Sequence, residues 1–286
     1  RDAAGDRKRL ERIAFWKGMI RSVADRKGAL FDHPVILAAV EAAEEHVAEG
    51  EKVLVFGRFT EPMQALVRLL NARAMLRALD AGKPWPQRRI AQGDEAAVAA
   101  AHRQMAREGR FDRKAIDASL EERYRKLENR RARLRPSIFD LVEEGLGLEK
   151  HDLLALARAA HAADEPAHLT AAIDTLLGER EDVADRGVGH EEFPAKHVAE
   201  AFEALVLALR EGSEGDDDNN DELDEREAER LWARLSERLA SEYATERGRH
   251  ARLMSGATDP ATRRQLQLGF NRPESNPRIL VAQSLV

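Results

Sequence analysis

The chain has no cysteine, and this absence excludes several kinds of chemistry at once. Without thiols there is no disulfide scaffold, thiolate zinc site, iron–sulfur cluster or cysteine nucleophile. Aromatic residues make up only 5% of the chain, which argues against a β-sandwich or barrel built on tyrosine and tryptophan. No apolar run approaches the roughly 20 residues of a membrane span, and residues 1–12 lack the apolar core of a signal peptide. We therefore expect a cytoplasmic protein with no membrane partner.

The composition favours a helical protein with a highly charged surface. Charged residues account for 34% of the 286 residues and hydrophobic residues for 43%, with alanine, leucine, glutamate and arginine dominant. These four residues are good helix formers. The formal net charge of −6 means that any surface for nucleic acid must be a local basic patch.

A short apolar run near the start of the chain predicts a β-strand. Residues 52–56 (KVLVF) lie between Gly50 and Gly57 and are continuously apolar after the lysine. Such a run is typical of a parallel strand buried on both faces. A helix over 35–48 precedes it, and Thr60 is expected to cap the helix that follows.

The same alternation of elements returns near the end of the chain. Residues 249–255 read as a strand ended by Gly256, and Asp259 is a good cap for a helix over 261–270. A further continuous apolar run, residues 279–282 (ILVA), follows and is also typical of a buried strand. We expect the three strands to lie side by side and parallel in one sheet, at residues 52–56, 249–255 and 278–284.

The region between these two parts is helical by pattern, with almost no strand signal. It is far longer than an ordinary helical crossover between parallel strands, so we interpret it as an insertion in an α/β domain. We predict a helical lead-in over residues 1–34 and the first part of an α/β lobe over 35–73. A helical insertion follows over 74–247, with an acidic loop at 212–225, and the second part of the lobe covers 248–286.

Motifs for catalysis and metal binding are missing from the sequence. Nothing matches the phosphate-binding pattern G-x-x-x-x-G-K-[ST], and no H-E-x-x-H occurs. His190 and His197 have the wrong spacing for two ligands one helical turn apart. We therefore predict no catalytic residue and no metal ligand set in this chain.

The most basic segment, residues 123–135, has two interpretations that the sequence leaves open. On a helix, Arg130, Arg131 and Arg133 would be an accessory contact to nucleic-acid phosphates. Glutamates such as Glu128 interleave with these arginines and can pair with them three or four residues away. That pattern is also typical of a solvated helix without a ligand.

Several segments in the two flanking parts match motifs of a known family in order and spacing. They are residues 32–34 (DHP), 51–56 (EKVLVF), 253–258 (LMSGAT), Arg263 with 270–271 (FN), and 278–284 (RILVAQS). Together they resemble the C-terminal RecA-like lobe of superfamily 2 helicases, most closely the Swi2/Snf2 type. The expected fold is therefore α/β, a partial RecA-like parallel sheet interrupted by a large, mostly α-helical insertion.

The resemblance implies a fragment of a larger ATP-dependent DNA translocase or helicase. In that family ATP and Mg²⁺ sit between two lobes, and the first lobe, with its phosphate loop and acidic metal-binding box, has no counterpart in this chain. We therefore expect this chain alone to bind no cofactor and to hydrolyse no ATP. An RNA helicase lobe and a non-enzymatic helical scaffold are the alternatives. The insertion is expected to contact a partner protein or to guide the nucleic acid.

The nucleic-acid contacts of the lobe are expected at the carboxyl ends of its parallel strands, where open α/β sheets bind ligands. Backbone amides, hydroxyls, an amide side chain and a guanidinium suit phosphate contacts that position a nucleic-acid strand without reading its bases. The residues predicted to contact the backbone are Gly57, Arg58, Gly256, Thr258, Gln283 and Ser284. Simple turn geometry is the competing explanation for the two glycines.

Overall fold

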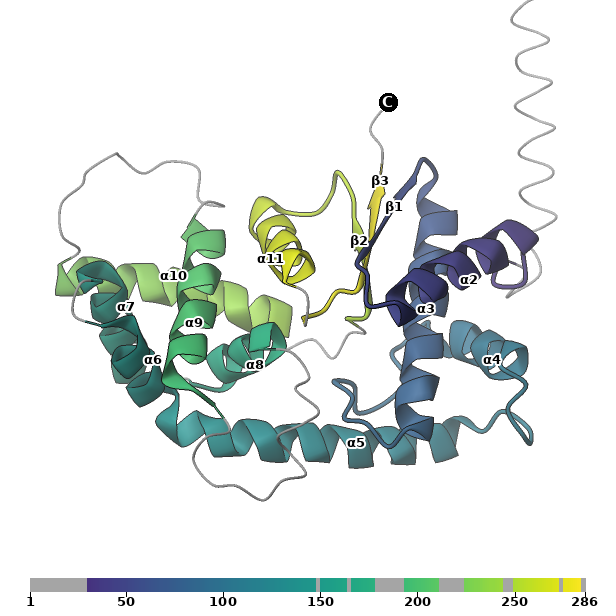
Figure 1. Ribbon diagram of the computed structural model, residues 1–286, viewed down its shortest axis with the longest axis horizontal. Coiled ribbons are helices and arrows are strands. Elements are labelled where there is room, and N and C mark those ends of the chain that lie inside the picture. Colours follow the sequence, from purple (N-terminus) through teal and green to yellow (C-terminus); the bar gives the residue numbers. More distant parts are fainter. Residues whose placement is uncertain are drawn as a thin grey trace, which may run out of the picture.

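The protein is an α/β structure in which helices dominate and a small parallel sheet lies between two groups of helices (Figure 1). The computed structural model describes residues 30–147, 150–163, 166–177, 193–210, 224–243, 249–272 and 275–283. Most of the predicted lead-in, most of the acidic loop and Ser284 lie outside the described residues. None of the described helices is both long enough and apolar enough to cross a membrane.

The sheet contains the three predicted strands in the order β1-β3-β2, all parallel. They are β1 (Val53–Gly57), β2 (Ala251–Met254) and β3 (Ile279–Gln283). Val281, in the central strand, is opposite Val55 on one side and Leu253 on the other. The prediction that distant segments of the chain pair in one parallel sheet is thus confirmed.

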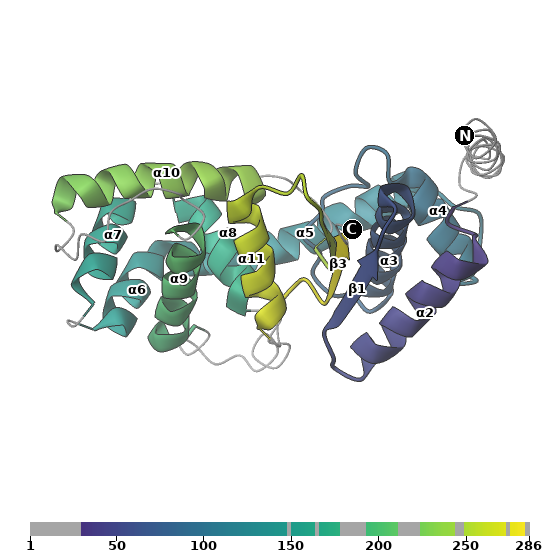
Figure 2. The same cartoon turned by 90° about the horizontal axis from the view of Figure 1, so that it is seen from above.

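Helices cover the two faces of the sheet unequally (Figure 2). α2 (Pro34–Ala48) and α3 (Thr60–Asp80) pack on one face, and α11 (Pro260–Asn271) packs against β2 and β3 on the other. The central strand is buried throughout residues 279–282. On the edge strand β1, however, Leu54 is 45% and Phe56 is 69% exposed. The prediction of a strand buried on both faces therefore holds for β3 and is wrong for β1, because α11 packs over β2 and β3.

Local capping sets the starts of the helices around the sheet. Asp259 accepts a hydrogen bond from the backbone N–H of Thr262 at 2.9 Å, as its position before a proline predicted. His33 plays the same part for α2, with Nδ1 accepting from the N–H of Val35 at 3.3 Å. Thr60 does not cap α3 but is its first residue, and the N-cap is Phe59, whose side chain has no polar atom to offer.

The described residues in the middle of the chain are mostly helical, as predicted. Its described elements are α4 (Glu95–Gln104), α5 (Arg113–Leu134), the 3₁₀ turn η1 (Arg135–Ser137), α6 (Ile138–Leu146), α7 (His151–Ala162), α8 (Pro166–Leu177), α9 (Ala195–Arg210) and α10 (Glu225–Tyr243).

The described residues form two hydrophobic cores, and the division between them falls within α5. The first core joins the sheet to α2, α3, α4 and the first turns of α5, including Ile116 and Leu120. The second begins at Leu134 and contains residues of α6 to α10. Residue 74, the predicted start of the insertion, lies inside α3, so the segment 74–120 packs with the sheet. The helical module with its own core begins near the end of α5.

Candidate nucleic-acid interface

The carboxyl ends of the strands meet at one edge of the sheet, which we call the carboxyl edge. Gly57 is opposite Gln283 at the ends of β1 and β3, and Met254 is opposite Ala282. Gln283 Nε2 donates a hydrogen bond to Thr60 Oγ1 at 3.4 Å, which links the end of β3 to the start of α3. The parallel arrangement therefore brings together segments that are more than 200 residues apart in the sequence.

Thr258 holds the turn between β2 and α11. Its Oγ1 accepts a hydrogen bond from the N–H of Ser255 at 2.9 Å, and its own N–H donates to Ser255 O at 3.0 Å. Arg263, one of the resemblance-bearing residues, donates to Thr258 O at 3.3 Å and so also has a structural role in this turn. Because Oγ1 accepts in the turn, the hydroxyl proton is the part of Thr258 that can serve a phosphate oxygen.

The predicted residues after β1 have different roles. A Cβ built at Gly57 would lie 2.5 Å from Met63 Sδ, so the end of the strand packs closely on this side chain of α3. Arg58 follows with an exposed side chain. Gly256 is likewise exposed, in the turn after β2. Arg58 thus carries a positive charge at this corner, while the Gly57 backbone lies against Met63.

Two aromatic residues that the sequence analysis did not assign to the site flank this arginine. Phe56 is 69% and Phe59 is 68% exposed. An exposed aromatic ring close to an arginine in the sequence is the kind of group on which unpaired bases stack. No local signal predicts this exposure, because the apolar run around Phe56 is equally typical of a buried strand.

Two helices begin at the carboxyl edge and add partial positive charge to it. α3 begins at Thr60 and α11 at Pro260, and the first backbone amides of a helix favour anions. Glu61 lies in the first turn of α3 and Asp259 caps α11, so carboxylates offset part of this charge. The edge is therefore suited to positioning a phosphate backbone through a few hydrogen-bond donors rather than through a large positive charge.

The arginines of α5 lie elsewhere, and two of them are engaged in the helical module. Arg131 is 8% exposed, with Nε 3.1 Å from Asp174 Oδ2 and Nη1 3.1 Å from Glu128 Oε1. Arg130 Nε lies 3.1 Å from Asp174 Oδ1, which is close enough for an ion pair. The angle between these groups is outside the range of a hydrogen bond. These contacts give both arginines a structural role, since a buried carboxylate pairs with both guanidinium groups, and the accessory phosphate contact at Arg130 and Arg131 stays a prediction.

Arg133 is exposed on α5, yet it is not part of the carboxyl edge. In Figure 1 the strands end at the top of the molecule, whereas α5 runs along the bottom. A nucleic acid at the carboxyl edge therefore does not meet the arginines of α5 on the same surface.

Lys52, the first residue of the "KVLVF" segment, has a structural role at the opposite end of the sheet. Its Nζ donates to the backbone oxygens of Gly269, Ser275 and Pro277 at 3.2, 2.5 and 2.9 Å. It also lies 5.8 Å from the centre of the Phe270 ring. Its contact with Phe270 thus joins two of the resemblance-bearing segments.

Comparison of the chain with family models, curated proteins and solved structures found no match. The group of metal-ligating side chains among the described residues is His46 with Glu49 and Glu51, which precede β1 and so lie away from the carboxyl edge.

Proposed function

We propose that this chain is the second RecA-like lobe of an ATP-dependent DNA translocase or helicase, closest to the Swi2/Snf2 type. The observation that carries the proposal is the parallel order β1-β3-β2, which gathers the ends of the resemblance-bearing segments at one edge. In this proposal ATP and Mg²⁺ bind in the parent protein between this lobe and a first lobe of the same parent chain.

The residues at the carboxyl edge support contact with the DNA backbone. Arg58 and the Thr258 hydroxyl supply donors, and Gln283 supplies an amide at the end of the central strand. Donors of this kind fix the position of a strand without reading its sequence. Phe59 adds a ring for an unpaired base.

The uncovered face of β1 supports a packing surface for another part of the parent protein. Leu54 and Phe56 are opposite the buried residues Leu280 and Ala282, so they belong to the same face of the sheet. Apolar side chains left open beside a buried face are typical of an interaction surface. We assign this face to packing against the remainder of the parent protein, and Arg58 with Phe59 to DNA.

DNA binding by the full chain tests the proposal, with fluorescence anisotropy on single-stranded and duplex DNA of one sequence. We expect Arg58→Ala to weaken binding to both. Phe59→Ala should weaken binding to single strands about fivefold or more and leave duplex affinity unchanged, because stacking needs an unpaired base. Arg110→Ala, an exposed arginine before α5, is the matched control. Wild-type affinity in both edge variants would overturn the proposal.

The same assay addresses the alternatives. Tighter binding to RNA than to DNA of the same sequence would favour an RNA helicase lobe. The separate core of the helical module supports a protein-interaction role, and Leu207 on α9 is 51% exposed there. Binding to no nucleic acid at all would favour the non-enzymatic scaffold.

Arg133→Ala distinguishes the two predicted roles of the helical module. Loss of DNA affinity in this variant would assign a DNA-guiding role to α5, and unchanged affinity would favour the partner-protein role. Arg131 is unsuitable for this test, because its removal would break the buried ion pair with Asp174.

A further inference from the structure

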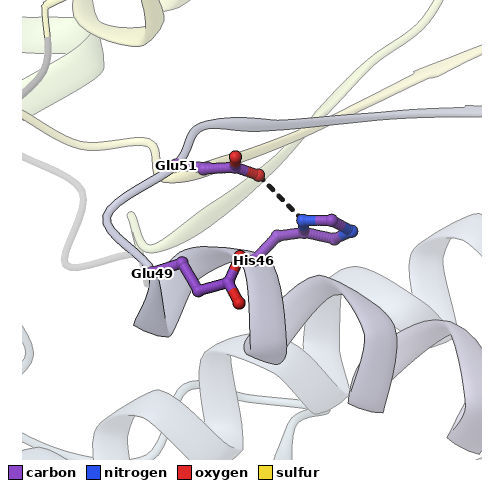
Figure 3. A group of neighbouring side chains, drawn as sticks. All are labelled: His46, Glu49 and Glu51. Atoms are coloured by element: carbon purple, nitrogen blue, oxygen red, sulfur yellow. Dashed lines mark hydrogen bonds and ion pairs between the residues drawn. The ribbon is translucent and has the colours of Figure 1, made fainter.

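Three side chains with metal-ligating atoms converge at the C-terminal end of α2 (Figure 3). They are His46, Glu49 and Glu51, whose ligand atoms all lie within 4.8 Å of one another. His46 Nδ1 is 2.8 Å from Glu51 Oε2, and the second ring nitrogen points away from both carboxylates. All three residues are exposed, so an ion can reach them from solvent.

The end of α2 explains why residues 46 and 51 meet. Gly50 has φ +87°, a left-handed conformation that glycine adopts without strain. The N–H of Glu51 then donates to His46 O, and the N–H of Gly50 donates to Val47 O, both at 3.0 Å. This helix-ending motif usually places two apolar side chains in contact. Here the same backbone geometry presents an imidazole and a carboxylate to each other.

The charges at this position favour a bound cation. The C-terminal end of a helix carries partial negative charge, which disfavours carboxylates there. Within the part of the chain that the structure describes, neither Glu49 nor Glu51 pairs with a lysine or arginine. By contrast, Glu44 on the same helix forms ion pairs with two arginines.

We propose that His46, Glu49 and Glu51 bind a divalent transition-metal ion, with Zn²⁺ as the best fit. An imidazole nitrogen with two carboxylates suits zinc, whereas Mg²⁺ and Ca²⁺ prefer oxygen ligands alone. Water would complete a tetrahedral site. Ligand atoms around tetrahedral zinc lie about 3.3 Å apart, so His46 and Glu51 need to separate by only about 0.5 Å.

A metal at this site would fasten the end of α2 to the entry of β1. Glu51 directly precedes Lys52, whose ammonium group holds the carbonyls of the loop before β3. The ion would therefore stabilise the amino-terminal end of the sheet. This inference is independent of the proposed DNA contact, which involves the opposite end of the strands.

Calorimetric titration of the chelator-treated full chain with ZnCl₂ at near-neutral pH tests the site. We expect one equivalent of zinc to bind, and excess MgCl₂ not to compete. His46→Ala should weaken the affinity at least about tenfold, as should Glu51→Gln. His151→Ala, an exposed histidine at the start of α7, is the control and should bind like the wild type. Thermal unfolding should show a zinc-dependent rise in Tm in the wild type and the control alone.

Two results would overturn the proposal: no zinc binding by the wild type, or undiminished zinc binding by His46→Ala and Glu51→Gln. Circular dichroism of each variant without metal checks the fold. Because Glu51→Gln keeps the size of the side chain, it serves as the second test if His46→Ala does not fold.

Discussion

At the scale of single residues, Lys52 connects β1 to the loop between α11 and β3. Its ammonium group satisfies three backbone carbonyls, which would otherwise lose hydrogen bonds in a partly buried setting. We predict that Lys52→Met, which keeps the apolar stem, lowers the free energy of unfolding by about 2–3 kcal/mol. Urea denaturation measures this change. Lys114→Met, at an exposed position, is the control, and an equal effect of both substitutions would contradict the assigned role.

His250 links the stability of the sheet to pH. Burial lowers the pKa of this imidazole from 6.5 to about 4, the nearby Glu44 opposes the shift, and Arg77, Arg278 and Lys52 reinforce it. The folded state therefore disfavours the protonated imidazole, while the unfolded chain binds a proton below about pH 6.5. Stability from this residue is present above pH 6.5 and is lost as the pH falls toward 4.

We predict that the wild type loses about 3 kcal/mol more than His250→Gln between these two pH values. Urea denaturation of both proteins across the range measures the difference. Parallel stability curves for the two proteins would show that His250 does not titrate as the structure indicates.

At the scale of elements, the contact between α6 and α9 depends on a glycine. A Cβ at Gly145 would collide with the carbonyl oxygen of Ala195 and lie 2.6 Å from Ala199 Cβ. We predict that Gly145→Ala destabilises the helical module by about 1–3 kcal/mol, since the helices must move apart. Glu144→Ala, on an exposed position of the same helix, should change stability by less than about 0.5 kcal/mol. Urea denaturation that showed equal stability for the two variants would refute the close contact.

The elements themselves were largely predictable from the sequence because their signals are local. Helical periodicity, the cap at Asp259 and the apolar run of β3 are each contained within a few residues. The end of α2 is also local, and the glycine at position 50 is the signal that brings His46 and Glu51 together. No prediction made from the sequence rested on that glycine.

The features that the sequence analysis missed depend on contacts between distant residues. Whether Phe56 is covered depends on β1 being an edge strand, and that order follows from pairing with a strand more than 200 residues away. Arg131 is held by Asp174, which lies 43 residues further along the chain. The division between the cores falls inside a single continuous helix, so no break in the sequence marks it.

At the scale of the whole molecule, we propose that this chain is one lobe of a motor protein that needs a second lobe for ATP hydrolysis. Phosphoryl transfer needs a phosphate cradle, a metal site and a group that stabilises charge on the transferred phosphate. The first two have no candidate motif in the sequence. We predict that the purified chain does not hydrolyse ATP, with or without DNA, in a steady-state assay. Turnover that is abolished by a point substitution within this chain would contradict this prediction.

The salt dependence of DNA binding tests the central claim most directly, because it counts phosphate contacts. Affinity for duplex DNA should fall with rising salt for the wild type. Arg58→Ala should reduce the slope of log K against log salt by about 0.9, the value for one phosphate contact. Arg110→Ala should leave the slope unchanged. A slope for Arg58→Ala equal to that of the wild type would contradict a backbone contact at the carboxyl edge.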